Sequence, residues 1–407
     1  MKTKNMLLVI LTIVILLAFS SGAAAQPNIT GEAAILVDAE TGKVLWGQNE
    51  RNQMAPASIT KLVTVLVAIE KGNLQDEVTV SEKAADTIGS RVWLQVGEVK
   101  TLEDLLYAAM LNSGNDAAIA IAEHIGGTVD DFVYMMNQRV REIGAHQTRF
   151  MNPTGLIDEG HHSTAYDIAL IMREALKNPK LKEIMGTDVR DWYGQEWQSR
   201  LMNLNQLLGQ YEGSLGGKTG YTSEAGRCLV NVAERDRMRL ISVVLRSSGQ
   251  NIWSDTTRIL DYGFNNYHML KFVDQGEEIL QIDRSGRVIP VIAGNIGEYL
   301  VSRNAEILPT SQIKIDNFSL PLREGDVIGT MEFILDGEVI ESVELVSGIN
   351  ARRSITLVGV YTVVTLIFFG LVALVLFLKA INMLMRRRND ININKARKPR
   401  YGGSRMY

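Results

Sequence analysis

Ile355 to Leu378 is an uncharged run dominated by leucine, valine, isoleucine and phenylalanine, and it restricts the fold more than any other segment. As a helix these 24 residues span roughly 36 Å, which is enough to cross a bilayer core of about 30 Å with some tilt. A buried helix of a soluble domain is the alternative, but no polar stripe divides the run. We therefore predict a transmembrane helix over residues 355–378, so the rest of the chain must fold on one side of the bilayer or the other.

The charges that flank this run predict its orientation. Lys379 and the arginines at 386–388 follow it, whereas only Arg352 and Arg353 stand close on the other side. The more basic flank of a transmembrane helix is usually cytoplasmic. We predict a basic cytoplasmic tail over residues 379–407 and a single-pass protein of the cell membrane, with its globular part on the extracytoplasmic side.

The N-terminus predicts export of that same globular part. Lys2 and Lys4 precede an apolar stretch at 6–19, and small residues follow at Ala23 to Ala25. This order is typical of a secretory signal peptide, so we predict that residues 1–25 are removed. An uncleaved membrane anchor is the alternative interpretation.

Composition excludes several classes of function. The formal net charge of −4 provides no broad basic face, so we expect no nucleic-acid partner. Cys228 is the only cysteine, so no internal disulfide can form and the exported domains depend on their cores. The five histidines include no His-Glu-x-x-His arrangement, and we expect neither a metal nor a cofactor.

Apolar periodicity divides the exported part into two domains. Residues 26–267 carry expected strands at both ends and helices between them, which predicts an α+β fold with one antiparallel sheet and an inserted helical subdomain. Residues 271–346 alternate in short runs, predict a small β-sandwich-like domain, and contain a hairpin turn at Asp336-Gly337. In the first domain we expect strands at 33–38, 43–48, 225–234 and 238–245, and helices at 102–111, 116–125, 130–143, 165–176 and 252–264.

Three short motifs carry the chemistry: Ser58-Ile59-Thr60-Lys61, Ser113-Gly114-Asn115 and Lys218-Thr219-Gly220. A serine hydroxyl needs an adjacent base to attack at neutral pH, and residues three apart on a helix share a face. A lysine can be that base only when its pKa is lowered by burial or by another positive charge. We predict Ser58 as the nucleophile and Lys61 as its general base. Another Ser-x-x-Lys occurs at residues 311–314, so this spacing alone decides nothing.

The second motif supplies groups near the reacting bond. We predict that Ser113 relays a proton toward the leaving amine and that Asn115 hydrogen-bonds an amide of the substrate. Both residues also fit a simple turn between two helices, and the two interpretations are compatible.

The third motif is expected on the edge of a sheet. There Lys218 provides positive charge, the Thr219 hydroxyl binds a terminal carboxylate, and Gly220 permits a close backbone approach. An oxyanion needs two preorganised N–H donors, and the backbone N–H groups of Ser58 and Tyr221 are the candidates by position.

These motifs and their flanks resemble the low-molecular-mass penicillin-binding proteins, the serine-type D-alanyl-D-alanine carboxypeptidases of peptidase family S11. The resemblance implies a β-lactamase/transpeptidase-like domain that removes the terminal D-alanine from peptidoglycan stem peptides through an ester on Ser58. It also implies that β-lactam antibiotics form a slowly hydrolysed ester on the same serine. The resembling segments are Ala55–Lys61, Ser113–Ala118, Asn152–Leu156, His162–Ala165 and Lys218–Gly226.

One position departs from that family. An arginine that helps to bind the substrate carboxylate is expected after the strand at 238–245, but this chain has Ile252 and Trp253 there. Arg246, Arg258 or Thr219 alone would have to replace it. The departure keeps open a catalytically weak, membrane-tethered peptidoglycan-binding protein. A serine β-lactamase is the other alternative, although no Glu-x-x-Leu-Asn segment of the class A type follows the second motif.

Overall fold

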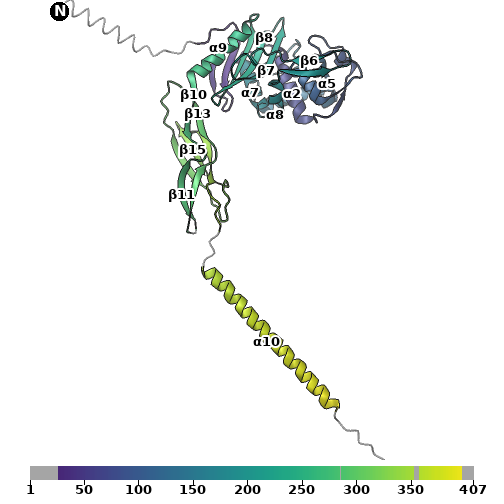
Figure 1. Ribbon diagram of the computed structural model, residues 1–407. Helices are drawn as coiled ribbons and strands as arrows, with labels where there is room; N and C mark the ends of the chain where they lie inside the picture. Colours follow the sequence, from purple (N-terminus) through teal and green to yellow (C-terminus); the bar gives the residue numbers. More distant parts are fainter. Residues whose placement is uncertain (1–25, 285, 353–356, 397–407) are drawn as a thin grey trace, which may run out of the picture. The chain divides into compact units, whose positions relative to one another are not determined.

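The computed structural model describes residues 26–284, 286–352 and 357–396 (Figure 1). The predicted signal peptide and the last residues of the predicted tail lie outside the described residues. The chain divides into two compact units, one that runs through Lys271 and includes Glu298–Leu308, and one formed by Phe272–Gly297 and the residues from Pro309 on.

The first unit is built on a five-stranded antiparallel sheet with the order β2-β1-β9-β8-β7. The early hairpin pairs with the late strands because β1 lies directly beside β9, as the sequence predicts. Strand β7 forms one edge of this sheet, so one of its sides is not paired within the sheet. The strands are β1 (Ala33–Asp38), β2 (Val44–Gln48), β7 (Ser214–Thr222), β8 (Gly226–Arg235) and β9 (Met238–Ser247).

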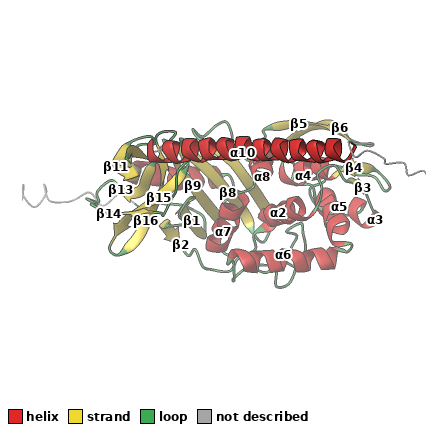
Figure 2. Ribbon diagram, turned by 90° about the horizontal axis from the view of Figure 1, so that it is seen from below, coloured by secondary structure: helices red, strands yellow, loops and turns green. Residues whose placement is uncertain are grey.

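Helices cover both faces of this sheet (Figures 1 and 2). Alternate residues of a strand point to opposite faces, and neighbouring residues of β8 accordingly lie in different cores. Val230 packs with the inserted helices, whereas Leu229 packs with Ile259 of α9. The helices are α2 (Lys61–Lys71), α3 (Glu82–Ala85), α4 (Leu102–Met110), α5 (Asn115–Gly126), α6 (Val129–Ile143), α7 (Ala165–Ala175), α8 (Pro179–Met185) and α9 (Asn251–Asn266), and the 3₁₀ turn η1 (Ala57–Thr60) precedes α2.

Threonine side chains fix where three of these helices begin. Each accepts a hydrogen bond from the backbone N–H of an aspartate three residues later, which satisfies a donor that the first helical turn leaves free. The pairs are Thr101 and Asp104, Thr128 and Asp131, and Thr164 and Asp167.

Some small elements of the first unit were not predicted. The hairpin of β5 (Val189–Tyr193) and β6 (Gln198–Met202) has one fully buried residue in each strand, Trp192 and Leu201, and otherwise displays polar or exposed side chains. A strand with so little buried surface has no clear apolar alternation. Other unpredicted elements of the chain include α3, α8 and the ribbons formed by β3 (Glu77–Thr79) with β4 (Val99–Thr101) and by β10 (Tyr267–Val273) with β13 (Gly297–Ser302).

The second unit contains a five-stranded antiparallel sheet in the order β11-β12-β16-β15-β14. The predicted hairpin at Asp336-Gly337 is confirmed, because both residues have positive φ angles, 52° and 86°, and join β15 to β16. Positive φ at both central residues gives the turn whose twist matches paired strands. The strands are β11 (Glu278–Arg284), β12 (Arg287–Ala293), β14 (Thr310–Ile315), β15 (Val327–Leu335) and β16 (Glu338–Ser347).

Helix α10 (Leu357–Ala396) holds the described part of the predicted apolar run, residues 357–378. Within it, Gly359–Arg387 has a mean hydropathy of 2.7 and is not covered by any described part of the protein. Apolar side chains on all sides of a long helix require an apolar surrounding. In the described part of the chain, this is the one helix long and apolar enough to cross a membrane.

Candidate active site

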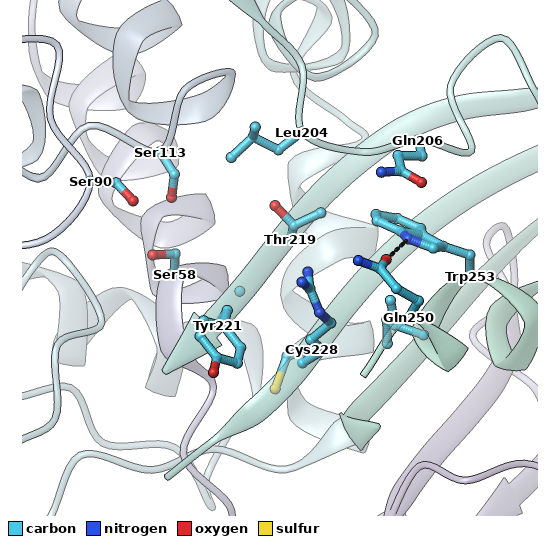
Figure 3. Close-up of a pocket in the computed structure, with 13 residues that line it drawn as sticks. Ser58, Ser90, Ser113, Leu204, Gln206, Thr219, Tyr221, Cys228, Gln250 and Trp253 are labelled. Atoms are coloured by element: carbon cyan, nitrogen blue, oxygen red, sulfur yellow. Dashed lines mark hydrogen bonds between the residues drawn. The ribbon is translucent and has the colours of Figure 1, made fainter. Parts of the chain in front are cut away.

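The three motifs meet beside the edge strand β7. Ser58 lies in η1, Ser113 lies in the turn between α4 and α5, and Thr219 lies on β7. Together they line a cleft of about 290 Å³. Figure 3 shows Ser58, Ser90 and Ser113 on one side of this cleft and Thr219, Gln250 and Trp253 toward the other. The remaining lining residues are Leu204, Gln206, Gly220, Tyr221, Arg227, Cys228 and Ile252.

The turn that presents Ser58 is tightly enclosed by backbone. Ala57 has a φ of 48°, a conformation that residues with a side chain rarely adopt. A Cβ added to Gly155 would lie 2.0 Å from the Ala57 carbonyl oxygen, and one added to Gly220 would lie 2.9 Å from that of Pro56. Glycine is therefore required where the loop around residue 155 and strand β7 close on this turn. The half-buried Ser58 is held in place by backbone on two sides.

Lys61 is completely buried, and its Nζ has three partners. Nζ lies 3.1 Å from Ser58 Oγ, and it donates to Asn115 Oδ1 and to the Thr154 carbonyl oxygen, both at 2.7 Å. A neutral amine has two N–H donors and one lone pair, so it can donate to the two carbonyl oxygens and accept from the serine hydroxyl. Each partner of a neutral Lys61 is therefore satisfied.

The surroundings of Lys61 favour that neutral form. Burial lowers the pKa of Lys61 well below its usual value, and the positive charge of Lys218 lowers this pKa further, whereas Asp116 raises it. Burial destabilises an ammonium because a low-dielectric interior solvates the charge poorly. These surroundings therefore favour the neutral amine, which is the form that a base needs.

Asn115 holds Lys61 rather than standing open in the cleft. Its Oδ1 accepts from Lys61, its Nδ2 donates to the Ile88 carbonyl oxygen at 2.6 Å, and its backbone N–H donates to the Ser90 carbonyl oxygen at 2.7 Å. Only 3% of Asn115 is exposed. The sequence did not indicate this contact, because it joins residues from separate motifs.

Lys218 forms a second buried pair, with Ser113. Its Nζ donates to Ser113 Oγ at 3.0 Å and to the Thr219 carbonyl oxygen at 3.2 Å. Burial lowers the pKa of Lys218 to about 7. A group with a pKa near the working pH is suited to act as a general acid or base. Ser113, with a φ of 59°, points its hydroxyl at this lysine.

His161 lies behind the nucleophile turn and was not predicted as a site residue. The Met151 backbone N–H donates to its Nδ1 at 3.1 Å, so its proton is on Nε2, 2.9 Å from Thr60 Oγ1. The Thr60 hydroxyl in turn donates to the Ala57 carbonyl oxygen at 2.8 Å. Burial lowers the pKa of His161 to about 4, so this neutral tautomer persists at physiological pH. His161 thus braces the strained residue that precedes Ser58.

The remaining predicted candidates are placed less centrally. Arg246 pairs with Glu32 at 3.0 Å and Arg258 pairs with Asp255 at 3.3 Å, and neither lines the cleft. Cys228 lines the cleft, but burial raises its thiol pKa to about 11, so it is not a nucleophile.

Comparison with known proteins is consistent with this geometry. The family model described as D-alanyl-D-alanine carboxypeptidase, of the peptidase S11 type, matches residues 20–249. The chain is 34% identical over 358 residues to the D-alanyl-D-alanine carboxypeptidase DacF of Bacillus subtilis, across 83% of this chain and 92% of that protein. It is 31% identical to DacA of Haemophilus influenzae, across 78% and 84%.

Solved structures have the same fold. Penicillin-binding protein 5 from Haemophilus influenzae aligns with a TM-score of 0.63 at 29% identity, covering 81% of this chain and all of that one. PBP3 from Streptococcus pneumoniae, described as a peptidoglycan synthesis regulatory factor, aligns with a TM-score of 0.68 at 27% identity, covering 79% and 99%.

Proposed function

This chain belongs to the D-alanyl-D-alanine carboxypeptidases of peptidase family S11, and from that premise we propose that Ser58 and Lys61 carry its reaction. The reaction is the removal of the terminal D-alanine from peptidoglycan stem peptides. The observation that most supports these roles is the 3.1 Å separation between the buried Lys61 Nζ and Ser58 Oγ.

Acylation follows from the hydrogen bonds around the two lysines. Lys61 accepts the Ser58 proton as Ser58 Oγ bonds to the carbonyl carbon of the terminal peptide bond. The C–N bond then breaks, and the departing D-alanine amine needs a proton. Ser113 supplies it and is recharged by Lys218, whose Nζ lies 3.0 Å away. A positioned acid or base of this kind contributes roughly 10²- to 10⁴-fold to a rate.

The developing oxyanion is held by backbone donors, and the ester is then hydrolysed. We assign the N–H groups of Ser58 and Tyr221 as the oxyanion donors, with Gly220 allowing strand β7 to approach Ser58 closely. Once D-alanine has left, Lys61 gives up the proton that it took from Ser58 and Lys218 regains one, so both amines return to their starting states. Water then attacks the ester carbonyl and Lys61 accepts a water proton, which it returns to Ser58 Oγ as the ester bond breaks. A β-lactam enters the same path, but its leaving group stays attached to the acyl group and hydrolysis is slow.

Thr219 binds the substrate in this proposal, whereas Asn115 acts through Lys61. Asn115 is buried and does not line the cleft, so it positions the Lys61 amine in place of the predicted contact with a substrate amide. The Thr219 hydroxyl faces the cleft and binds the terminal carboxylate. The serine β-lactamase alternative loses support, because the related proteins reported above are named carboxypeptidases or penicillin-binding proteins.

The membrane placement completes the proposal. Helix α10 serves as the single span, residues 26–267 form the catalytic domain outside the cell, and residues 271–346 form a β domain that follows it in the sequence. Residues 1–25 are the signal peptide and 379–407 the cytoplasmic tail. Supporting this, α10 contains a candidate span of 29 residues, Gly359–Arg387, whose uncharged run ends at Leu378 and is followed by basic residues. Protease treatment of intact cells should degrade the catalytic domain and spare a tag at the C-terminus; loss of the tag would reverse the topology.

Mass spectrometry after exposure to penicillin tests the nucleophile. We expect one adduct on the Ser58 peptide, together with release of D-alanine from a pentapeptide that ends in D-Ala-D-Ala. Ser58→Ala should abolish both. Ser311→Ala is the matched control, because Ser311 begins the other Ser-x-x-Lys, on exposed β14 where Lys314 pairs with Glu332. An adduct that survives Ser58→Ala would refute the assignment.

A further inference from the structure

The substrate's terminal carboxylate needs a positive partner, and the expected arginine is missing from the start of α9. We propose that Arg227, on strand β8, binds this carboxylate together with the Thr219 hydroxyl. Of the described side chains that line the cleft, Arg227 alone carries a formal charge. The inference rests on the proposed function and names the residue that selects substrates with a free carboxyl terminus.

Strand register places Arg227 beside Thr219. Tyr221 of β7 pairs with Arg227 of β8, and Thr219 pairs with Leu229. Because side chains alternate along a strand, all four lie on one face of the sheet. Arg227 is thus the diagonal neighbour of Thr219, about 7 to 8 Å away, a distance that a long side chain spans. Leu229 packs against α9, so this is the face from which the missing arginine would have reached the cleft.

The guanidinium of Arg227 is available for a ligand. Its Cζ lies 5.4 Å from the centre of the Tyr221 ring, a contact that orients the group without neutralising it. Among the described residues of the first unit, no carboxylate forms an ion pair with Arg227. By contrast, Arg246 and Arg258 are both paired with carboxylates away from the cleft.

The other polar groups near Thr219 do not replace this charge. Lys218 is 1% exposed and is already bound to Ser113 and to a carbonyl oxygen. Gln250 and Trp253 occupy the start of α9, where Trp253 Nε1 donates to Gln250 Oε1 at 3.0 Å (Figure 3). Both are neutral. A planar guanidinium can make two parallel hydrogen bonds to a carboxylate, which none of these groups can do.

The test compares two substrates with wild type and with Arg227→Gln. One is a pentapeptide ending in D-Ala-D-Ala with a free carboxylate, and the other is its C-terminal amide. We expect Arg227→Gln to lower kcat/KM for the acid by about 10- to 100-fold, mostly through KM, and to leave the amide unchanged. Arg227→Lys should recover part of the loss, because it retains the charge but not the bidentate geometry. Arg246→Gln on β9 is the matched control and should behave as wild type.

A second measurement makes the outcome independent of peptide hydrolysis. Penicillin carries a carboxylate and its methyl ester does not, so Arg227→Gln should slow acylation of Ser58 by penicillin and spare acylation by the ester. The role of Arg227 would be overturned if Arg227→Gln affected the peptide acid and its amide equally, or penicillin and its methyl ester equally. It would also be overturned if the substitution affected neither member of a pair. A wild-type chain that is acylated but releases no D-alanine would overturn the proposed reaction alone, and one that is not acylated would overturn both. If Arg227→Gln folds poorly, the wild type is tested instead. Its KM for the acid must rise with the salt concentration, whereas its KM for the amide must not.

Discussion

Acidification should destabilise the catalytic unit through His161. This histidine is neutral in the folded protein, and burial lowers its pKa from the usual 6.5 to about 4. The unfolded chain therefore binds a proton first, and the free energy of unfolding falls as the pH drops from 6.5 toward 4. A difference of roughly 2.5 units at about 1.4 kcal/mol each gives a loss of about 3 kcal/mol across this window. His161 is 7% exposed, so solvent screening removes little of this effect.

The effect is isolated by subtracting a variant that cannot titrate. His161→Gln keeps a donor and an acceptor but has no pKa in this range. At pH 7.5 its free energy of unfolding should be lower than that of wild type. This difference should shrink by about 3 kcal/mol at pH 4, because only the wild type is destabilised by protonation of residue 161 in the unfolded chain. Carboxylates that titrate in both proteins cancel in the difference.

Urea unfolding of the full chain in detergent, followed by tryptophan fluorescence, provides the assay. All five tryptophans lie between residues 46 and 253, so the signal reports the first unit alone. His146→Gln, which changes an exposed histidine of the same unit, is the control and should leave the pH dependence as in wild type. A gap between wild type and His161→Gln that stays constant from pH 7.5 to 4 would refute the reasoning.

Three further predictions concern the cleft. Lys61→Arg should slow acylation of Ser58 by about 10²- to 10⁴-fold at pH 7.5, because arginine keeps its proton; acylation by a labelled penicillin measures this, and near-normal rates would contradict Lys61 as the base. Gly155→Ala should lower the free energy of unfolding by more than Gly160→Ala does. Both positions have positive φ, 81° and 84°, which costs alanine about 1 to 2 kcal/mol, but only at Gly155 would the Cβ also meet the Ala57 carbonyl oxygen, at 2.0 Å. Urea unfolding of the two variants compares them, and equal losses would mean that the crowding is relieved. Cys228 should resist thiol reagents in the folded protein at pH 7.5, since it is 1% exposed and its pKa is raised to about 11; labelling as fast as in urea would show that the cleft opens.

Much of the fold could be predicted because its signals are local. The cap at Thr101, the hairpin at Asp336-Gly337 and the apolar periods of the long helices depend on residues a few positions apart. The hairpin of β5 and β6 could not be predicted this way, because Trp192 and Leu201 are its only fully buried side chains and its strands have no sustained alternation.

The residues of the site also fall into those that local motifs predict and those whose position depends on contacts between distant parts of the chain. The order of the three motifs predicts that Ser58, Lys61 and Lys218 lie in one cleft. Ser58 needs a base, and Lys61 can be that base when another positive charge lies close to it. The position of Arg227 depends on cross-strand register, and that of His161 on packing behind the turn. Register at Arg227 could have been counted outward from the turn that joins Thr222 to Gly226, which is the one signal the sequence offered.

The buried amine of Lys61 makes the reaction conditional on an intact fold. Its three partners come from separate stretches of the chain, and any loosening of one of them would admit solvent to the amine. A solvent-exposed amine is protonated at neutral pH, and a protonated amine cannot activate the serine. Partial unfolding of the domain therefore removes the reactivity of Ser58, so a partly opened molecule is inactive and does not acylate itself on unintended substrates.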